Sequence, residues 1–327
     1  MKNNFKKVAL TSKLGVGLIC ILSALTINSA QATSSTIQKI KSSGSVTIGV
    51  RESSGALSYK LGNDKYAGFH VELCRKVIRD LQQQLKLPSI KIQYQPVTAE
   101  NRIPLVQDGT VDIECGSTTN TLARQKDVAF AVTTYVEEVR MAVRADSGIT
   151  SISQLTNKVV ATTTGTTSIQ LLRQHERAKD LSFEVILGKD HADSFLLLES
   201  GRADAFVMDT STLAGNIANA KKPKDFKIVG EILSVEPIAI MMRKDDPEFK
   251  QAIDDSIIAL MKNGTIAKMY NKWFLGAIPP RGQRVGLELS LNTKAAWAKP
   301  NDLPIEDYMK KKITLKSNLR NFLMGLQ

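Results

Sequence analysis

The feature that most constrains the fold is an alternation of short apolar runs with helical patterns along most of the chain. Short apolar runs bounded by turn residues favour buried strands, and apolar residues recurring about every three or four positions favour helices. The expected strands are 46–50, 90–97, 111–115, 158–162, 183–187, 205–208 and 238–242. The expected helices are 68–85, 98–109, a segment around 169–172, 192–200, 247–264 and 265–274. Strands alternating with helices predict an α/β fold built from mostly parallel sheets.

Two smaller patterns refine this expectation. Thr98 and Thr265 are expected to cap helices, and residues 281–304 are expected to be irregular. The layout of a helix end, a glycine, two residues, an aspartate and a strand occurs at 105–113 and again at 197–205. This repetition fits two lobes of similar βα construction, although ordinary αβ connections also produce it.

The first 32 residues have the three parts of a secretory signal peptide. Residues 1–13 carry lysines and no acid, and an apolar core at 14–27 precedes Ala30-Gln31-Ala32, which fits a cleavage site. The core is shorter than the roughly 20 residues that a transmembrane helix needs. We therefore expect removal of residues 1–32 and a periplasmic location. A lipid-anchored Cys20 is an alternative, but the residues before it match a lipidation motif poorly.

The charge balance is basic, at +12 for the whole chain, and loss of a leader with four lysines and no acid would leave 12 − 4 = +8. Such a balance can indicate nucleic-acid binding. However, the sequence shows no basic patch interleaved with aromatic residues, so we expect no nucleic-acid partner and favour attraction for anionic solutes. A basic tail, 305–327, is expected to be a solvated terminus, with an amphipathic helix at a membrane or partner as the alternative.

Two cysteines remain after the leader. Cys74 lies in a helical pattern, and Cys115 ends an expected strand. An oxidising compartment permits a disulfide between them. Their spacing does not show whether they meet, and buried free thiols are common, so both states stay open.

The strand expected at 111–115 is followed by a stretch rich in hydrogen-bond donors, Gly116–Arg124. Backbone N–H groups, the hydroxyls of Ser117 and Thr119 and the guanidinium of Arg124 together suit a carboxylate. A helix cap followed by a surface arginine would explain the same stretch, so other parts of the chain must decide.

Polar residues also stand at or just after the ends of other expected strands. They are Arg51, Arg102, Thr167, His191 and Asp209. In α/β sheets, ligands bind at these carboxyl ends, and with two lobes the ends can face a shared cleft. A dicarboxylic amino acid would use Asp209 for its ammonium group and Arg51, Arg102 and His191 for its second carboxylate. Taken alone, each arginine could be solvated, and His191 and Asp209 could be helix caps.

Six motifs in order resemble the periplasmic glutamate/aspartate-binding proteins of bacterial ABC uptake systems. The motifs are Arg51-Glu52-Ser53-Ser54, Asn101-Arg102-Ile103-Pro104-Leu105, Glu114-Cys115-Gly116-Ser117-Thr118-Thr119-Asn120, Lys189-Asp190-His191-Ala192-Asp193-Ser194-Phe195, Leu198-Glu199-Ser200-Gly201-Arg202-Ala203 and Ile278-Pro279-Pro280. The resemblance runs from about residue 37 to residue 303 and leaves the tail outside.

The resemblance implies a two-lobed periplasmic binding fold of type II, in which each lobe is a mostly parallel sheet flanked by helices. The ligand would lie in the cleft between the lobes, and crossings near residues 140 and 240 would form a hinge. The implied division gives lobe 1 residues 33–140 and 241–304, and lobe 2 residues 141–240.

The resemblance also implies a role for each site residue. Ser117, Thr119 and Arg124 would hold the α-carboxylate, Thr167 would add a contact from the other lobe, Asp209 would take the ammonium, and Arg51, Arg102 and His191 would hold the side-chain carboxylate. Two departures stand out: Ala99 replaces a serine near the side-chain pocket, and 240–242 lacks a cysteine that could pair with Cys115 in relatives.

The expected function is therefore capture of L-glutamate or L-aspartate and delivery to the membrane permease of an ABC transporter, by a monomer that uses no cofactor or metal. One alternative is a glutamine-type ligand. Another is a dehydratase-like enzyme on the same fold, for which His191 or Glu52 would be the general acid or base. The sequence has no Gly-x-Ser-x-Gly, His-Glu-x-x-His or phosphate-loop motif that would favour an enzyme.

Overall fold

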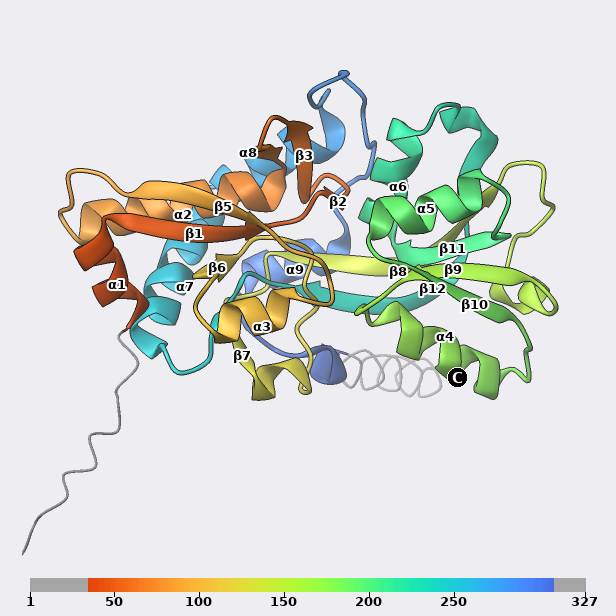
Figure 1. The fold of residues 1–327 in the computed structure, drawn as a ribbon, viewed down its shortest axis with the longest axis horizontal. Helices are drawn as coiled ribbons and strands as arrows, with labels where there is room; N and C mark the ends of the chain where they lie inside the picture. Colours follow the sequence, from red (N-terminus) through yellow and green to blue (C-terminus); the bar gives the residue numbers. More distant parts are fainter. Residues whose placement is uncertain (1–34, 309–327) are drawn as a thin grey trace, which may run out of the picture. The chain divides into compact units, whose positions relative to one another are not determined.

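The computed structural model describes residues 35–308 (Figure 1). The predicted signal peptide, 1–32, and most of the predicted tail lie outside the described residues. Within the described part of the chain, no helix is both long and apolar enough to cross a membrane.

The first sheet has five strands in the order β5-β1-β6-β13-β7. β1 (Ser45–Val50) is parallel to its neighbours β5 (Lys91–Pro96) and β6 (Ile113–Glu114). β13 (Met241–Arg243) is antiparallel to both β6 and β7 (Val128–Phe130). Four strands therefore run in one direction, and β13 runs against them.

The second sheet repeats this plan in the order β10-β9-β11-β8-β12. β9 (Val159–Thr163) is parallel to β10 (Glu184–Gly188) and β11 (Ala205–Asp209). β8 (Tyr135–Arg144) is antiparallel to both β11 and β12 (Phe226–Ile238). Each sheet is therefore mixed: the expectation of mostly parallel sheets holds for strand direction, but half of the neighbouring pairs are antiparallel.

Helices with one apolar face cover the sheets. The helices that accompany the first sheet are α1 (Thr36–Ser43), α2 (Phe69–Gln84), α3 (Arg102–Gln107), α7 (Pro247–Lys262), α8 (Thr265–Tyr270), a π-helical turn (Asn271–Leu275) and α9 (Leu291–Ala298). Those of the second sheet are α4 (Ser168–Ala178), α5 (His191–Glu199) and α6 (Thr210–Asn219). Short 3-10 turns lie at η1 (Arg124–Lys126), η2 (Ile152–Leu155) and η3 (Pro223–Asp225). In α2, residues Phe69, Leu73, Val77 and Leu81 recur every four positions, and all are buried.

β8 and β12 carry the chain between the two sheets. Their antiparallel pairing extends from Arg144 opposite Phe226 to Tyr135 opposite Ile238, with an irregularity between Val229 and Ser234. Tyr135 and Ile238 pack in the core of the first sheet, whereas Val139 packs in the core of the second. In Figure 1 the two strands run together across the middle of the described residues.

A small third sheet, which follows β1 in the chain, contacts α6 of the second sheet through β2. It contains β2 (Ser53–Ser54), β3 (Ser58–Gly62) and β4 (Lys65–Ala67). Gly55 follows β2 with φ +54°, and a Cβ on it would lie 2.3 Å from the carbonyl oxygen of Ser211. A Cβ on Gly215 of α6 would lie 2.5 Å from the Cα of Gly55. Main chain therefore meets main chain here, and no side chain fits between them.

The structure corrects several expected elements. β12 was not predicted as a strand, and the strand expected at 238–242 is two pieces, because Ile238 ends β12 and Met241 begins β13. α3 begins at Arg102 with Asn101 as its N-cap, not at Thr98; the main-chain N–H of Thr98 donates to Asn101 Oδ1 at 2.8 Å in the preceding turn.

Two further corrections concern the C-terminal part. Gly264, in the left-handed conformation, is the N-cap of α8 in place of Thr265. The region expected to be irregular, 281–304, contains α9, whose N-cap Ser290 accepts a hydrogen bond from the Thr293 N–H at 3.1 Å. This helix packs on β8, because its buried Thr293 hydroxyl accepts from the N–H of Val136 at 3.1 Å.

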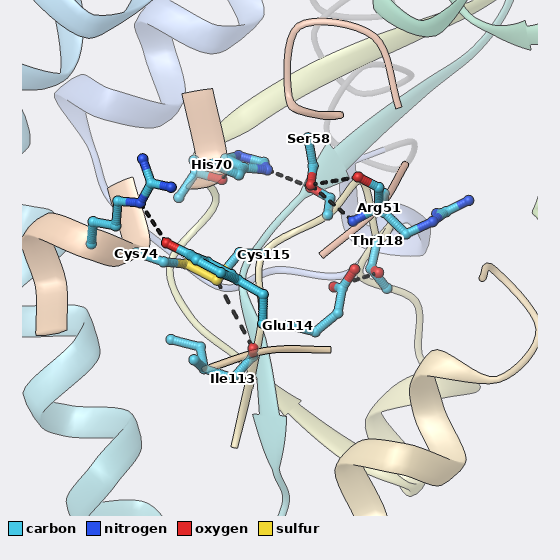
Figure 2. Close-up of a disulfide and its surroundings, with 12 residues drawn as sticks. Arg51, Ser58, His70, Cys74, Ile113, Glu114, Cys115 and Thr118 are labelled. Atoms are coloured by element: carbon cyan, nitrogen blue, oxygen red, sulfur yellow. Dashed lines mark hydrogen bonds between the residues drawn. A yellow bond between two sulfur atoms is a disulfide. The ribbon is translucent and has the colours of Figure 1, made fainter. Parts of the chain in front are cut away.

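The two remaining cysteines form a disulfide (Figure 2). It joins Cys74 of α2 to Cys115, which directly follows β6, and both residues are fully buried. The question that the sequence left open is therefore answered in favour of the bridge. The bridge ties α2 to the point where the donor-rich stretch begins.

Candidate functional site

Residues from both sheets line one small cavity. The lining residues are Arg51, Arg102, Ser117, Thr119, Arg124, Thr166, Thr167, His191, Met208 and Asp209. All eight residues predicted from the sequence are among them. Thr166 and Met208 also line the cavity and were not predicted.

The first sheet supplies one wall of this cavity from its strand ends. Arg51 directly follows β1, and Arg102 opens α3 after β5. Ser117 and Thr119 follow β6, and Arg124 opens η1. Because the carboxyl ends of parallel strands meet at one edge of a sheet, these side chains converge although they are distant in sequence.

The second sheet supplies the opposite wall in the same way. Thr167 is the N-cap of α4 after β9, His191 opens α5 after β10, and Asp209 ends β11. The alternative interpretation of His191 as a helix cap is wrong, and that of Asp209 holds for its position alone. Asp190, not His191, caps α5 by accepting from the N–H of Ala192 at 2.8 Å. Asp209 stands at the N-cap position of α6, but its side chain makes no capping hydrogen bond.

The donor-rich stretch is held in place from the side of α2. His70 is fully buried, and its Nδ1 lies 2.5 Å from the carbonyl oxygen of Gly116. Burial lowers the pKa of His70 to about 4, so the ring is neutral and Nδ1 carries the hydrogen that it donates to Gly116. Figure 2 shows His70, the disulfide and Glu114 around this strand end. The position of Ser117 is therefore fixed by covalent and hydrogen-bonded neighbours.

Buried polar atoms with no hydrogen-bond partner gather at the cavity. Arg51 and Arg102 are each 2% exposed. Among the described residues, Nη1 of Arg51, Nε of Arg102 and Oδ1 of Asp209 have no partner. Burial, followed by the charge of Arg102, lowers the pKa of Arg51 to about 10, so Arg51 remains cationic at neutral pH. Burial also lowers the pKa of Arg102. A buried polar group without a hydrogen-bond partner destabilises the folded protein, and a bound ligand could supply the missing partners.

His191 is a neutral ring that holds one of these arginines. Burial, with the charges of Arg51 and Arg102, lowers its pKa well below the usual value. Nη2 of Arg51 lies 3.2 Å from Nε2 of His191, and a guanidinium can only donate, so Nε2 is the acceptor. Nδ1 then carries the hydrogen and donates to Thr163 Oγ1 at 2.9 Å. His191 therefore links the two walls through Arg51.

Arg124 also contacts both walls. Its Nη1 donates to the carbonyl oxygen of Thr119 at 2.8 Å, and its Nη2 donates to that of Gly165 at 3.2 Å. The arginine is therefore positioned by the main chain of the two loops that carry Thr119 and Thr167. It is not a freely solvated surface residue.

Two buried acids near the cavity were missed from the sequence. Glu236 of β12 is 1% exposed, and Glu114 of β6 is fully buried. Glu236 accepts hydrogen bonds from the hydroxyls of Thr119 and Thr167, and Glu114 accepts from the hydroxyl of Thr118 at 2.8 Å. Each is an acidic residue inside an apolar run. A charged residue is rarely buried in such a run without a specific partner, so this pattern could have identified both acids from the sequence.

Asp209 is the acid that titrates most unusually at the cavity. Burial, followed by the nearby charge of Glu236, raises its pKa to about 8, although Arg102, Arg124 and Arg51 act in the opposite direction. A cationic partner at Oδ1 would favour the ionised form. The cavity thus offers several cationic donors and one carboxyl group poised to ionise.

Two α/β sheets joined by crossing strands, with strand ends around a shared polar cavity, make up the two-lobed fold of the type II periplasmic binding proteins. The chain belongs to the bacterial extracellular solute-binding proteins of family 3, which residues 46–276 match. The fold and the family that the sequence motifs indicated are therefore confirmed, with the sheets mixed as described above.

Curated relatives and a solved structure agree with this membership. The chain is 41% identical over 275 residues to the glutamate/aspartate import solute-binding protein of Escherichia coli, covering 84% of this chain and 91% of that one. It is 42% identical over 273 residues to the L-glutamate/L-aspartate-binding protein of Pseudomonas aeruginosa, covering 83% and 90%. The ancestral amino acid-binding protein AncCDT-1, a precursor of cyclohexadienyl dehydratase, superposes with a TM-score of 0.64 at 28% identity, covering 73% and 99%.

Proposed function

We propose that this protein is a periplasmic receptor that binds L-glutamate or L-aspartate in the cavity and delivers it to the permease of an ABC transporter. The observation that carries the proposal is the pair of buried guanidinium groups, Arg51 and Arg102. Among the described residues, each has one nitrogen without a hydrogen-bond partner, Nη1 of Arg51 and Nε of Arg102, at a cavity that also holds Arg124 and Asp209. Relatives named for glutamate and aspartate support the same ligand class.

The charges suggest how the ligand lies. Arg124, with the loops of Ser117, Thr119 and Thr167, takes the α-carboxylate, and Asp209 pairs with the ammonium group. Arg51, held by His191, and Arg102 take the second carboxylate as charge-assisted hydrogen bonds. The side chain of a basic ligand would be repelled by the positive charges of Arg51 and Arg102. The side-chain amide of glutamine carries no negative charge and would bind these donors less well than a carboxylate does.

Binding would be coupled to movement of two lobes about the crossing strands β8 and β12. Lobe 1 would contain 33–140 and 241–304, and lobe 2 would contain 141–240. Contacts from both walls to one ligand exist only when the lobes are closed, so the ligand favours the closed form, which the permease recognises. We expect the mature protein to be a monomer that starts after residue 32.

The arrangement of the two candidate acid–base residues favours binding over catalysis. Both ring nitrogens of His191 are engaged, with Arg51 and with Thr163. Glu52 does not line the cavity and pairs instead with Lys60 at 2.7 Å, where both side chains are about 40% exposed. We therefore propose a receptor without enzymatic activity, although the fold resembles a dehydratase precursor.

The ligand class is tested by calorimetric titration of residues 33–327, freed of bound ligand by unfolding and refolding. The panel is glutamate, aspartate, glutamine, asparagine, histidine and arginine. We expect tight binding of the two acids alone.

In an Arg102→Gln variant, the preference for glutamate over glutamine should shrink, because a charge-assisted contact to the second carboxylate is lost. Equal weakening of both ligands would contradict the role of Arg102, and binding of no ligand in the panel would contradict the function.

Proton release on binding gives a second test, which concerns Asp209. Its pKa is about 8 in the ligand-free protein, and pairing with an ammonium group lowers it. Binding at pH 7 should therefore release close to one proton, about 0.9 for a group that titrates at pH 8. The affinity should fall as pH falls below 8, by up to about tenfold per unit.

The proton count is obtained by repeating the titration in two buffers of different ionisation enthalpy. An Asp209→Asn variant serves as the control, and its observed enthalpy should no longer depend on the buffer. If the wild-type enthalpy were the same in both buffers at pH 7, the pairing of Asp209 with the ammonium group would be wrong.

A further inference from the structure

A single carboxylate oxygen joins the two walls of the cavity. Oε2 of Glu236, on the crossing strand β12, accepts a hydrogen bond from Thr119 Oγ1 at 2.7 Å and another from Thr167 Oγ1 at 2.7 Å. Thr119 follows a strand of the first sheet, and Thr167 follows a strand of the second. Glu236 is itself 1% exposed.

The direction of these hydrogen bonds limits what the two threonines can do for a ligand. A hydroxyl has one hydrogen to donate and two lone pairs that accept. Because both hydrogens point to Glu236, each hydroxyl presents lone pairs to any group that approaches it from the cavity. A ligand carboxylate cannot accept from such an oxygen, whereas an ammonium group can donate to it.

The other groups of the cavity also provide separate places for the ammonium group and the carboxylate of an amino acid. The unpartnered Oδ1 of Asp209 belongs to the same cavity and also needs a donor. Arg124, fixed by the carbonyl oxygens of Thr119 and Gly165, is the donor-only group that is held at the loops carrying Thr119 and Thr167. A carboxylate therefore belongs at Arg124, and an ammonium group belongs where Asp209 and the oriented hydroxyls face it.

We propose that Glu236 is a positioning residue that fixes the hydroxyls of Thr119 and Thr167 as hydrogen-bond acceptors, and thereby makes the site select ligands that carry an α-ammonium group. This inference rests on the proposed function and refines it: the two threonine hydroxyls serve the ammonium group, and the α-carboxylate depends on Arg124 and the adjoining main chain. Glu236 acts through the threonines and needs no contact with the ligand.

The test compares glutamate with glutarate, which has both carboxylates and no amine. The affinity for glutarate is measured by competition against glutamate, so that weak binding can be quantified. A Glu236→Leu variant has no acceptor at this position and frees both hydroxyls to rotate. We expect glutamate to lose much more affinity than glutarate. The ratio of the glutarate dissociation constant to the glutamate dissociation constant should therefore fall about tenfold or more, as for a lost hydrogen bond to a charged group.

Two further variants separate positioning from charge or folding. A Glu236→Gln variant keeps an acceptor oxygen without the charge and should retain the wild-type ratio within about threefold. Glu138→Gln, a change of the half-buried acid on the partner strand β8, should alter neither affinity. A Thr119→Val variant removes one oriented hydroxyl and should lower the ratio, as Glu236→Leu does. This variant keeps the test available if Glu236→Leu folds poorly.

The outcomes are distinguishable. Equal weakening of both ligands in Glu236→Leu, or an unchanged ratio in Thr119→Val, would overturn the proposal, because a purely structural role affects both ligands alike. A ratio in Glu236→Gln as low as in Glu236→Leu would also overturn it, because charge and not acceptor geometry would then matter. Failure of the proposed function appears separately, as the absence of glutamate binding by the wild-type protein.

Discussion

Replacement of Arg124 by alanine is expected to weaken glutamate binding about 30-fold to several thousand-fold. The α-carboxylate would stay in a site closed to water without its cationic partner, at a cost of about 2–5 kcal/mol. Arg124 is suited to this role because the main chain of both walls holds its guanidinium, so little side-chain freedom is lost when the ligand binds. The measurement is a calorimetric titration of the ligand-free variant.

Arg173→Ala is the matched control for this experiment. Arg173 lies on α4, is more than half exposed and pairs only with Glu176 at 3.3 Å within the described residues. Its loss should leave the affinity unchanged and the fold intact. An Arg124→Ala variant that folds normally and binds glutamate as tightly as the control would remove Arg124 from the site.

Loss of the disulfide is expected to have the largest effect on stability. Cys74 and Cys115 are 41 residues apart in sequence, and closing a loop of this length in the unfolded chain corresponds to about 4 kcal/mol in the chain-entropy model. A Cys74→Ala, Cys115→Ala variant should lose about 2–5 kcal/mol of its free energy of unfolding. Alanine suits both positions because both are fully buried.

Denaturant unfolding of the oxidised wild type and the double variant measures this difference. The wild-type protein unfolded in the presence of a reductant should resemble the variant. A loss below about 1 kcal/mol would mean that the bridge contributes little, and that packing of α2 on β6 suffices to hold the strand end.

The elements that could be predicted are those in which local pattern and tertiary packing agree. The four-residue spacing in α2 and the apolar run of β1 each fill a buried surface, so periodicity alone located them. β12 was missed because its first half is only partly buried and contains Gly230 and an irregular register, so it lacks a strand's alternation. α9 was missed because its surroundings are rich in loop residues and its core contacts are few.

The site shows the same division. Arginine, threonine and aspartate at strand ends can be found from the sequence, because the end of each strand is a local feature. The partners that orient them cannot, because Glu236 lies 117 residues from Thr119 and 69 residues from Thr167. The pairing of Cys74 with Cys115 likewise depends on α2 lying over β6, and spacing contains no information about that contact.

The close approach of Gly55 and Gly215 bears on how this site would distinguish its two acids. Gly55 lies a few residues after Arg51, and Gly215 lies in the helix that follows Asp209. Because backbone abuts backbone there, rotating a side chain cannot bring these segments nearer to each other. The shortest span between the arginine wall and the aspartate wall is thus set by the main chain and not by the occupant. Aspartate, one methylene shorter than glutamate, would have to bridge the same span by side-chain adjustment or an intervening water molecule, so we expect the affinity to depend on the length of the ligand.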